Sequence, residues 1–249
     1  MRSVLITGAS SGIGAALARE YAAPGVRLAL CGRDAVRLEE VAAACRATGA
    51  EVAACVLSVT DAEAVAAWVA EADAAAPLDL VVANAGISAG TGDGSESAEQ
   101  TRAIFAVNVD GVLNTVLPAL APMRARRRGQ VAIVASVAGF RGLPSAPAYC
   151  ASKAAVKAWG EGLRGWLAGD GVRVSVILPG FVESRITAAN RFRMPFLMPA
   201  EKAARLIRRG LERDRGRIAF PWPTVFGAWL LSVLPDALAD RLTRGLPGK

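Results

Sequence analysis

The sequence predicts an α/β fold in which helices cover both faces of one parallel β-sheet. Six short apolar runs, at residues 2–7, 26–31, 51–56, 79–83, 130–135 and 172–178, alternate with alanine-rich segments of helical length. Strands that are apolar throughout are typical of a sheet buried on both sides. A chain of 249 residues also fits one domain with a sizeable core. We therefore expect a single doubly wound domain over residues 1–249, without a linker or an internal repeat.

The first apolar run leads into a glycine-rich turn. The sequence from Thr7 to Gly14 reads Thr-Gly-Ala-Ser-Ser-Gly-Ile-Gly, and a helix is expected from Ile13 to Ala23. Glycine permits positive φ and close approach, and the first amides of a helix can face a pyrophosphate. The same pattern also arises at turns for steric reasons alone, so the turn by itself leaves both interpretations open. The expected phosphate contacts are Gly8, Ser10, Ser11, Gly12, Ile13 and Gly14.

The end of the second strand indicates which dinucleotide fits. The strand ends at Gly32-Arg33, where a guanidinium can bind a 2′-phosphate, whereas a carboxylate would accept hydrogen bonds from a ribose 2′-hydroxyl. Asp34 comes one position later, and we expect it to cap the helix predicted over Ala35 to Thr48. NADP(H) is therefore favoured over NAD(H).

Three polar residues after the fifth apolar run form a set that can move a proton. Ser136 follows the run 131–135, and Tyr149 and Lys153 are one helical turn apart. A cation on the same helix face favours phenolate over phenol, so Lys153 is expected to lower the pKa of Tyr149. The Ser136 hydroxyl can hold a substrate oxygen within reach of the phenol. A Tyr-x-x-x-Lys spacing alone is common on solvated helices, and it is the serine and the glycine turn that favour catalysis.

These motifs together resemble the short-chain dehydrogenase/reductase family. They follow the family's order over nearly the whole chain: Thr7-Gly8-x-x-x-Gly12-x-Gly14, Asn84-Ala85-Gly86, Asn108, Ser136, Tyr149-x-x-x-Lys153 and Pro179-Gly180. The resemblance implies a Rossmann fold with a seventh strand near Arg217–Phe220. It also implies that Tyr149 is the catalytic acid/base, that Ser136 orients the substrate oxygen, that Lys153 lowers the tyrosine pKa and binds the nicotinamide ribose, and that Asn108 holds a water in a proton relay.

The resemblance implies further cofactor contacts and shows three departures. Ser11 stands where many NADP-preferring relatives have a basic residue, Ser58 where an aspartate commonly binds the adenine, and Ser184 where threonine is usual beside the carboxamide. A hydroxyl is kept at Ser58 and Ser184. The cofactor contacts expected beyond the glycine turn are Arg33, Ser58, Val59, Asn84, Ala85, Gly86, Tyr149, Lys153, Pro179, Gly180, Val182 and Ser184.

Cysteine use and charge limit the other function classes. The four cysteines, at 31, 45, 55 and 150, have no C-x-x-C spacing and histidine is absent, so no metal site or redox dithiol is expected. The cysteines and the start of the chain directly in the first strand predict a cytoplasmic location. The net charge of +7 is concentrated at 124–128 and 205–217. These runs either end solvated helices or attract an acidic partner, and no aromatic platform for nucleic acid accompanies them.

The carboxyl-terminal third is expected to contain the substrate region, residues 182–216, and a hydrophobic extension, residues 220–249. The loop 88–95 is either a plain turn or a substrate rim. Residues 218–234 include two tryptophans and two phenylalanines, and 235–242 predicts a short amphipathic helix. The apolar run 224–234 is about half of the roughly 20 residues that span a membrane. Three interpretations remain for it: a pocket wall or subunit interface, a peripheral membrane contact, and a lid over the core.

The sequence thus predicts an NADP(H)-dependent oxidoreductase that reduces a ketone or aldehyde, or oxidises a secondary alcohol, on a moderately hydrophobic small-molecule substrate. One alternative is a 3-oxoacyl thioester reductase whose basic segment 205–217 meets an acidic carrier, and another is a non-catalytic, cofactor-binding regulatory protein. A homodimer or homotetramer is implied by the resemblance. The expected helix Ala151–Leu167 carries an apolar stripe that either pairs subunits or faces the chain's own sheet: Val156, Trp159, Leu163 and Leu167.

Overall fold

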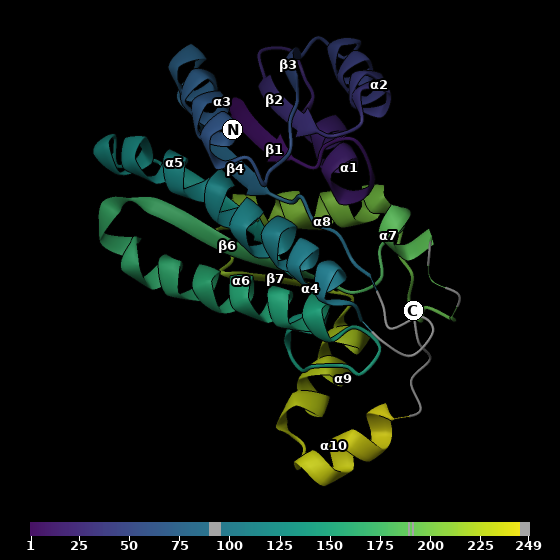
Figure 1. The fold of residues 1–249 in the computed structure, drawn as a ribbon. Helices are drawn as coiled ribbons and strands as arrows, with labels where there is room; N and C mark the ends of the chain where they lie inside the picture. The colour runs from purple at the N-terminus through teal and green to yellow at the C-terminus, as the bar shows by residue number, and fades with distance from the viewer. Residues whose placement is uncertain (90–95, 189, 191, 245–249) are drawn as a thin grey trace.

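Seven parallel strands form one sheet in the computed structural model, which describes residues 1–89, 96–188, 190 and 192–244 (Figure 1). The strand order is β3-β2-β1-β4-β5-β6-β7. The predicted doubly wound sheet and its seventh strand are therefore confirmed. The strands are β1 (Ser3–Thr7), β2 (Arg27–Gly32), β3 (Glu51–Val56), β4 (Leu80–Ala83), β5 (Gly129–Val134), β6 (Val172–Pro179) and β7 (Arg217–Phe220).

Helices pack on both faces of this sheet and produce two apolar layers. In β2, Leu28 and Leu30 belong to one layer while Ala29 and Cys31 belong to the other, which explains why the strand is apolar at every position. One face is covered by α1 (Gly12–Tyr21), α2 (Ala35–Arg46) and α8 (Ala200–Glu212), and the other by α3 (Ala62–Ala75), α5 (Gly111–Ala125) and α6 (Pro147–Trp166).

The remaining elements lie near the carboxyl ends of the strands or extend from the body. They are α4 (Ala98–Phe105), a π-helix (Ala106–Asp110), 3₁₀ turns at Val137–Gly139 and Ala168–Asp170, α7 (Arg185–Ala188), α9 (Trp222–Val233) and α10 (Asp236–Thr243). Strand β1 lies between β2 and β4, so the order of the strands reverses there. In open α/β sheets ligands bind at the carboxyl ends of the strands beside such a reversal.

The described part of the chain contains one helical run, residues 98–125, that has the length and the apolar composition of a membrane span. Its last part, α5, packs beside α3 and against the sheet, and Val116 and Met123 are fully buried there. Position in the core therefore accounts for its composition.

The apolar stripe on α6 faces the chain's own sheet. Val156, Leu163 and Leu167 are buried in the layer that α6 shares with β5 and β6, and Trp159 packs against the same layer. These buried side chains support the interpretation that the stripe faces the chain's own sheet, and subunit pairing through α6 stays a prediction.

The arginine runs are neutralised within the chain only in part, because Arg205, Arg209, Arg213 and Arg215 form no ion pair with a described residue. Arg208 pairs with Glu212 and Arg217 pairs with Glu161 in the second run. In the first run every second residue makes an ion pair: Arg124 with Asp170, Arg126 with Asp73, and Arg128 with Asp79. These contacts favour the interpretation of both runs as helix ends in solvent.

Candidate active site

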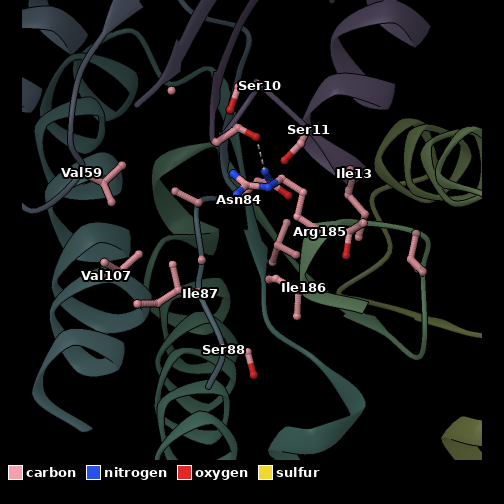
Figure 2. Close-up of a pocket in the computed structure, with 18 of the residues that line it drawn as sticks. Ser10, Ser11, Ile13, Val59, Asn84, Ile87, Ser88, Val107, Arg185 and Ile186 are labelled. Atoms are coloured by element: carbon pink, nitrogen blue, oxygen red, sulfur yellow. Dashed lines mark hydrogen bonds between the residues drawn. The ribbon is translucent and has the colours of Figure 1, made fainter. Parts of the chain in front are cut away.

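A cavity of about 680 Å³ opens at the carboxyl ends of the strands (Figure 2). It brings together residues that are up to 179 positions apart, from Gly8 to Thr187. Of the predicted site residues, only Gly14 and Asn108 do not line it. The predicted residues that do are Gly8, Ser10, Ser11, Gly12, Ile13, Arg33, Ser58, Val59, Asn84, Ala85, Gly86, Ser136, Tyr149, Lys153, Pro179, Gly180, Val182 and Ser184.

The turn between β1 and α1 requires glycine at three positions. Gly8 and Gly12 have φ values of +66° and +54°, which residues with a Cβ rarely adopt. A Cβ at Gly14 would clash with the carbonyl oxygen of Gly8 and stand 2.5 Å from Nδ2 of Asn84. Gly14 therefore packs against the Gly8 carbonyl and Asn84, and it does not line the cavity.

Asn84 holds this turn against the end of β4. Its Nδ2 donates to the carbonyl oxygens of Thr7 (2.9 Å) and Gly8 (3.2 Å). In return, the Thr7 hydroxyl accepts from the backbone N–H of Asn84 (3.1 Å) and of Ala85 (3.2 Å). These four bonds fix the position of the glycine turn relative to the centre of the sheet.

The start of α1 fits a dinucleotide phosphate. Ser11 is the N-cap residue, and its side chain makes no capping bond. The first amides of α1 therefore need another acceptor, and they carry the positive end of the helix dipole. Together with the two positive-φ glycines and the excluded Cβ at Gly14, this arrangement has the form of a pyrophosphate cradle.

The side of the cavity at the end of β2, where we expect the adenosine of the cofactor, contains two arginines. Arg33 is exposed at the end of β2. Asp34 caps α2 by accepting from the N–H of Arg37 (3.0 Å), as the sequence predicted, and its other oxygen pairs with the Arg37 guanidinium at 2.6 Å. Arg37 also lines the cavity, and its Nε is buried without a hydrogen-bond partner in the described residues. Arg37 was not among the residues predicted from the sequence; it lies in the first turn of α2, whereas Arg33 precedes the N-cap Asp34 and lies outside the helix.

Ser58 and Val59 form another part of that wall. The Ser58 hydroxyl shares a hydrogen bond of 2.8 Å with the hydroxyl of Thr60. Val59 is buried beside Gly111, and its carbonyl oxygen accepts from Asn114 Nδ2 at 2.9 Å. The backbone at this point is thus fixed from α5, while the Ser58 side chain stays on the cavity wall.

Ser136, Tyr149 and Lys153 meet at the reacting end. Ser136 follows β5 and accepts from the N–H of Ala138 at 3.1 Å. Tyr149 lies in the first turn of α6, and its side chain is hydrogen bonded to that of Ser136. Lys153 follows one turn later, and its Nζ donates to the carbonyl oxygen of Val134 at 2.8 Å. The three residues that the sequence grouped are therefore held together by the end of one strand and the start of one helix.

Burial sets the acidity of both titrating groups. It lowers the pKa of the Lys153 ammonium from 10.5 to about 8. It also raises the pKa of Tyr149 above its ordinary value, and the hydrogen bond with Ser136 acts in the opposite direction. The Nζ of Lys153 stands over the tyrosine ring, 5.9 Å from its centroid. The sequence shows the nearby cation but not the burial. The pKa of Tyr149 is therefore raised, whereas the sequence predicted that it would be lowered.

Asn108 lies behind the site, in the π-helix between α4 and α5. It is fully buried, and its Oδ1 accepts from the N–H of Ile87 at 2.8 Å. Its Nδ2 donates to the carbonyl oxygen of Ile87 (2.9 Å) and to the hydroxyl of Ser152 (3.0 Å). A π-helical turn often marks a functional position because it re-aims one side chain. Here it joins the segment after β4 to the helix that carries Tyr149 and Lys153, and the role in a water relay stays a prediction.

Several cavity residues near the reacting end were not singled out by the sequence analysis. Val107 flanks Asn108, and Ser88 precedes residues 90–95, so the predicted loop rim lies mostly outside the described residues. Arg185, Ile186 and Thr187 belong to the expected substrate region 182–216, and Ser88 belongs to the expected loop, although none of them was named as an individual site residue. The sequence did not indicate Ile87 and Val107.

The glycine turn, the Ser136–Tyr149–Lys153 set and their shared cavity match a known family. A sequence model described as short chain dehydrogenase matches residues 2–194. The chain belongs to the short-chain dehydrogenase family. It is accordingly an oxidoreductase with a Rossmann-type domain.

Curated relatives extend the likeness beyond the matched segment. The chain is 42% identical over 246 residues to an oxidoreductase of Myxococcus xanthus, covering 98% of this chain and 97% of the relative. It is 41% identical to galactitol 2-dehydrogenase (L-tagatose-forming) of Cereibacter sphaeroides over 76% of this chain and 74% of the relative. It is also 31% identical to a ketoacyl reductase of Nostoc sp. over 79% of this chain and 69% of the relative.

Solved short-chain dehydrogenases share the fold. One from Sphingobium yanoikuyae, in complex with NADPH, superposes with a TM-score of 0.81 at 28% identity over 95% of this chain and 98% of that one. One from Burkholderia phymatum, in complex with NAD, superposes with a TM-score of 0.83 at 27% identity, over 99% of this chain and 96% of that one. Both nicotinamide dinucleotides thus occur among similar structures.

Proposed function

We propose that this short-chain dehydrogenase uses NADP(H) to reduce a ketone or aldehyde, or to oxidise the matching secondary alcohol, on a moderately hydrophobic substrate. The observation that carries the proposal is the hydrogen-bonded pair of Ser136 and Tyr149 beside the buried Lys153, in the same cavity as the glycine turn. Family membership supports the reaction class, and the residues present support the assignment of roles.

In the proposed reaction, the residues of this chain would have the following roles. A bound nicotinamide supplies or accepts the hydride. The amides at the start of α1 would hold the pyrophosphate, and Lys153 would bind the nicotinamide ribose. Ser136 donates a hydrogen bond to the substrate oxygen, and Tyr149 donates its phenolic proton to the same oxygen. Because burial raises the pKa of Tyr149, its protonated form is favoured, which supports the reductive direction.

The preference for NADP(H) is supported by the two arginines on the adenosine side. Both carboxylate oxygens of Asp34 are engaged by Arg37, so this acid is poorly placed to accept from a ribose 2′-hydroxyl. The Nε of Arg37 has no partner in the described residues, and Arg33 is exposed on the cavity wall. Two guanidinium groups suit a 2′-phosphate.

A 3-oxoacyl thioester reductase remains the second candidate, and the ketoacyl reductase of Nostoc sp. is the observation that favours it. The basic segment 205–217 gives it limited support, since Arg208 and Arg217 already form ion pairs inside the chain. Comparing acetoacetyl thioesters with simple ketones of equal length would separate the two functions.

We also propose a homodimer or homotetramer in a reducing cytoplasm, with residues 182–216 beside the substrate. The family resemblance supports the assembly, and the four free thiols suit the compartment. Light scattering at micromolar concentration tests the assembly, and a monomer would contradict it. Proximity labelling in cells would test the compartment.

The decisive experiment is a panel of carbonyl compounds and alcohols assayed with NADPH and NADH, for the wild type and for Tyr149→Phe. Turnover that prefers NADPH and is lost in the variant supports the proposed function. Tight NADPH binding without turnover of any substrate would instead identify a non-catalytic cofactor-binding protein.

A further inference from the structure

Helix α9 presents an apolar surface on the outside of the protein. None of its residues is buried, and its large side chains project outward, with Trp222 75% exposed. At about 100° per residue, their spacing places them within an arc of about 100° on one side of the helix. Figure 1 shows α9 and α10 extending from the body below α6. We call this the α9 stripe, and it consists of Trp222, Phe226, Trp229, Leu230 and Val233.

Helix α10 adds apolar side chains and positive charge next to the stripe. Leu238 and Leu242 are exposed. The two carboxylates of α10, Asp236 and Asp240, pair with Arg141 at 3.2 and 3.3 Å. Its two cations, Arg241 and Arg244, form no ion pair with any residue that the structure describes. The charge that α10 leaves uncompensated is therefore positive, as is the net charge of +7 of the whole chain.

The size of the stripe argues against a second copy of the chain as its partner. The stripe and the two exposed leucines of α10 comprise seven residues. A stable protein interface has about 20–30 residues on each partner. A lipid surface has no such requirement, because each side chain that enters it is transferred separately from water.

We propose that the α9 stripe docks on the surface of an anionic lipid bilayer, with α9 parallel to the membrane plane. Tryptophan and phenylalanine favour the boundary between headgroups and acyl chains. Arg241 and Arg244 are then attracted to the anionic headgroups. The helix is too short to span the bilayer, because it has 12 of the roughly 20 residues required.

The docking surface is close to the reacting end of the cavity. Thr224 of α9 touches Gly180, since a Cβ at that glycine would stand 3.2 Å from the threonine methyl carbon. Arg141, which holds α10, lies five residues after Ser136. Docking therefore brings the cavity near the lipid phase, where a hydrophobic carbonyl compound is concentrated. This consequence rests on the proposed function, whereas the docking itself does not.

Vesicle sedimentation tests the docking with the full chain. The probes are vesicles of phosphatidylcholine alone and vesicles with equal amounts of phosphatidylcholine and phosphatidylglycerol. We expect the wild type to bind the anionic vesicles, and Phe226→Ser/Trp229→Ser to lower the partition coefficient at least about tenfold, because two large apolar side chains no longer leave water. Neither residue is buried, so the variant should keep the wild-type melting temperature.

A matched control separates the stripe from exposed aromatic residues in general. Trp166 at the end of α6 is 62% exposed and lies outside the stripe, so Trp166→Ser should leave vesicle binding unchanged within about twofold. Binding that is lost equally in both variants, or kept in the double variant, would overturn the proposal.

The charge contribution has its own pair of variants. Arg241→Gln/Arg244→Gln should weaken binding to the anionic vesicles about thirtyfold and leave any binding to phosphatidylcholine unchanged, since each of the two cations contributes about 1 kcal/mol near such a surface. Arg173→Gln, at the opposite end of the sheet, should have no effect.

Self-association provides the competing result. If the wild type binds no vesicles but forms an oligomer that Phe226→Ser/Trp229→Ser dissociates, the occupant is a second copy and the proposal is wrong. Sedimentation uses neither cofactor nor substrate, so its failure would leave the proposed function untouched.

Discussion

The two ends of the cavity are built differently. At the reacting end, Lys153 is buried and bonded to the backbone of Val134, and Tyr149 is bonded to a serine that is itself fixed by Ala138. At the end where we expect the adenosine, Arg33 is exposed, and the Ser58 hydroxyl is bonded only to the hydroxyl and the backbone N–H of Thr60 in the described residues. In the proposed function, packing therefore fixes the groups that move the proton, whereas exposed polar groups would select the cofactor. Substitutions at the first end should change turnover, and those at the second should change cofactor affinity.

Tyr149→Phe should cause the largest change. It removes the transferable proton and keeps the ring, so turnover should fall by between about 10² and 10⁴ while NADPH affinity stays nearly constant. The control is Tyr21→Phe in α1, because the hydroxyl of Tyr21 is buried and has no partner in the described residues. That control should keep full turnover. Wild-type turnover in Tyr149→Phe would contradict the proposed mechanism.

Lys153 should make stability depend on pH. Burial lowers its pKa from 10.5 to about 8 in the folded chain. Between these values the unfolded chain holds the proton that the folded chain has lost, so the free energy of unfolding rises with pH across that window. The rise is about 3 kcal/mol for a shift of this size. Below pH 8 the cost of burying the ammonium is fully present.

Denaturant unfolding of the wild type and of Lys153→Met, at pH 7.5 and at pH 10, measures this effect. The other titrating groups are common to both proteins and cancel in the difference. The wild type should gain stability relative to the variant as the pH rises. A difference that does not depend on pH would mean that Lys153 is solvated in the folded chain.

The contrast between the two ends also explains what the sequence could predict. The apolar runs and the glycine turn report backbone geometry, so six of the seven strands and the Asp34 cap followed from local residues, whereas β7 followed only from the family resemblance. The stripe of Val156 and Leu163 on α6 was ambiguous, because helical spacing shows that a face is apolar and not which surface covers it. The pKa of Tyr149 depends on burial by distant segments, which no local motif reports.

Contacts that depend on strand register could not be predicted from the sequence either. Cys31 and Cys55 are register partners on β2 and β3, and Cys55 raises the pKa of the buried Cys31 as a lesser cause beside burial. Their separation of 24 positions matches no cysteine spacing rule. Arg37 was missed for a different reason, since its role depends on the direction in which α2 leaves the strand.

Arg33→Ala and Arg37→Ala should each weaken NADPH binding by about ten- to one hundredfold, because a charge-assisted hydrogen bond contributes about 1.5–3 kcal/mol. NADH binding should change much less. Arg27→Ala is the control, since Arg27 starts the same strand and pairs with Glu51 away from the cavity. Fluorescence titration with both cofactors measures the selectivity. Equal losses for NADPH and NADH would place both arginines away from the 2′-phosphate.

Ser58 should produce the smallest change and report on the adenine alone. A carboxylate in Ser58→Asp can accept from the adenine amino group while it keeps the bond to Thr60, so both cofactors should bind about fivefold more tightly, the equivalent of about 1 kcal/mol. Ser58→Ala should weaken both by a similar factor. The two cofactors share the adenine, and the effect should therefore be the same for NADPH and NADH. A change confined to NADPH in the same titration would instead put Ser58 beside the 2′-phosphate. Three residues at this end of the cavity, Arg33, Arg37 and Ser58, would then contact the phosphate instead of two.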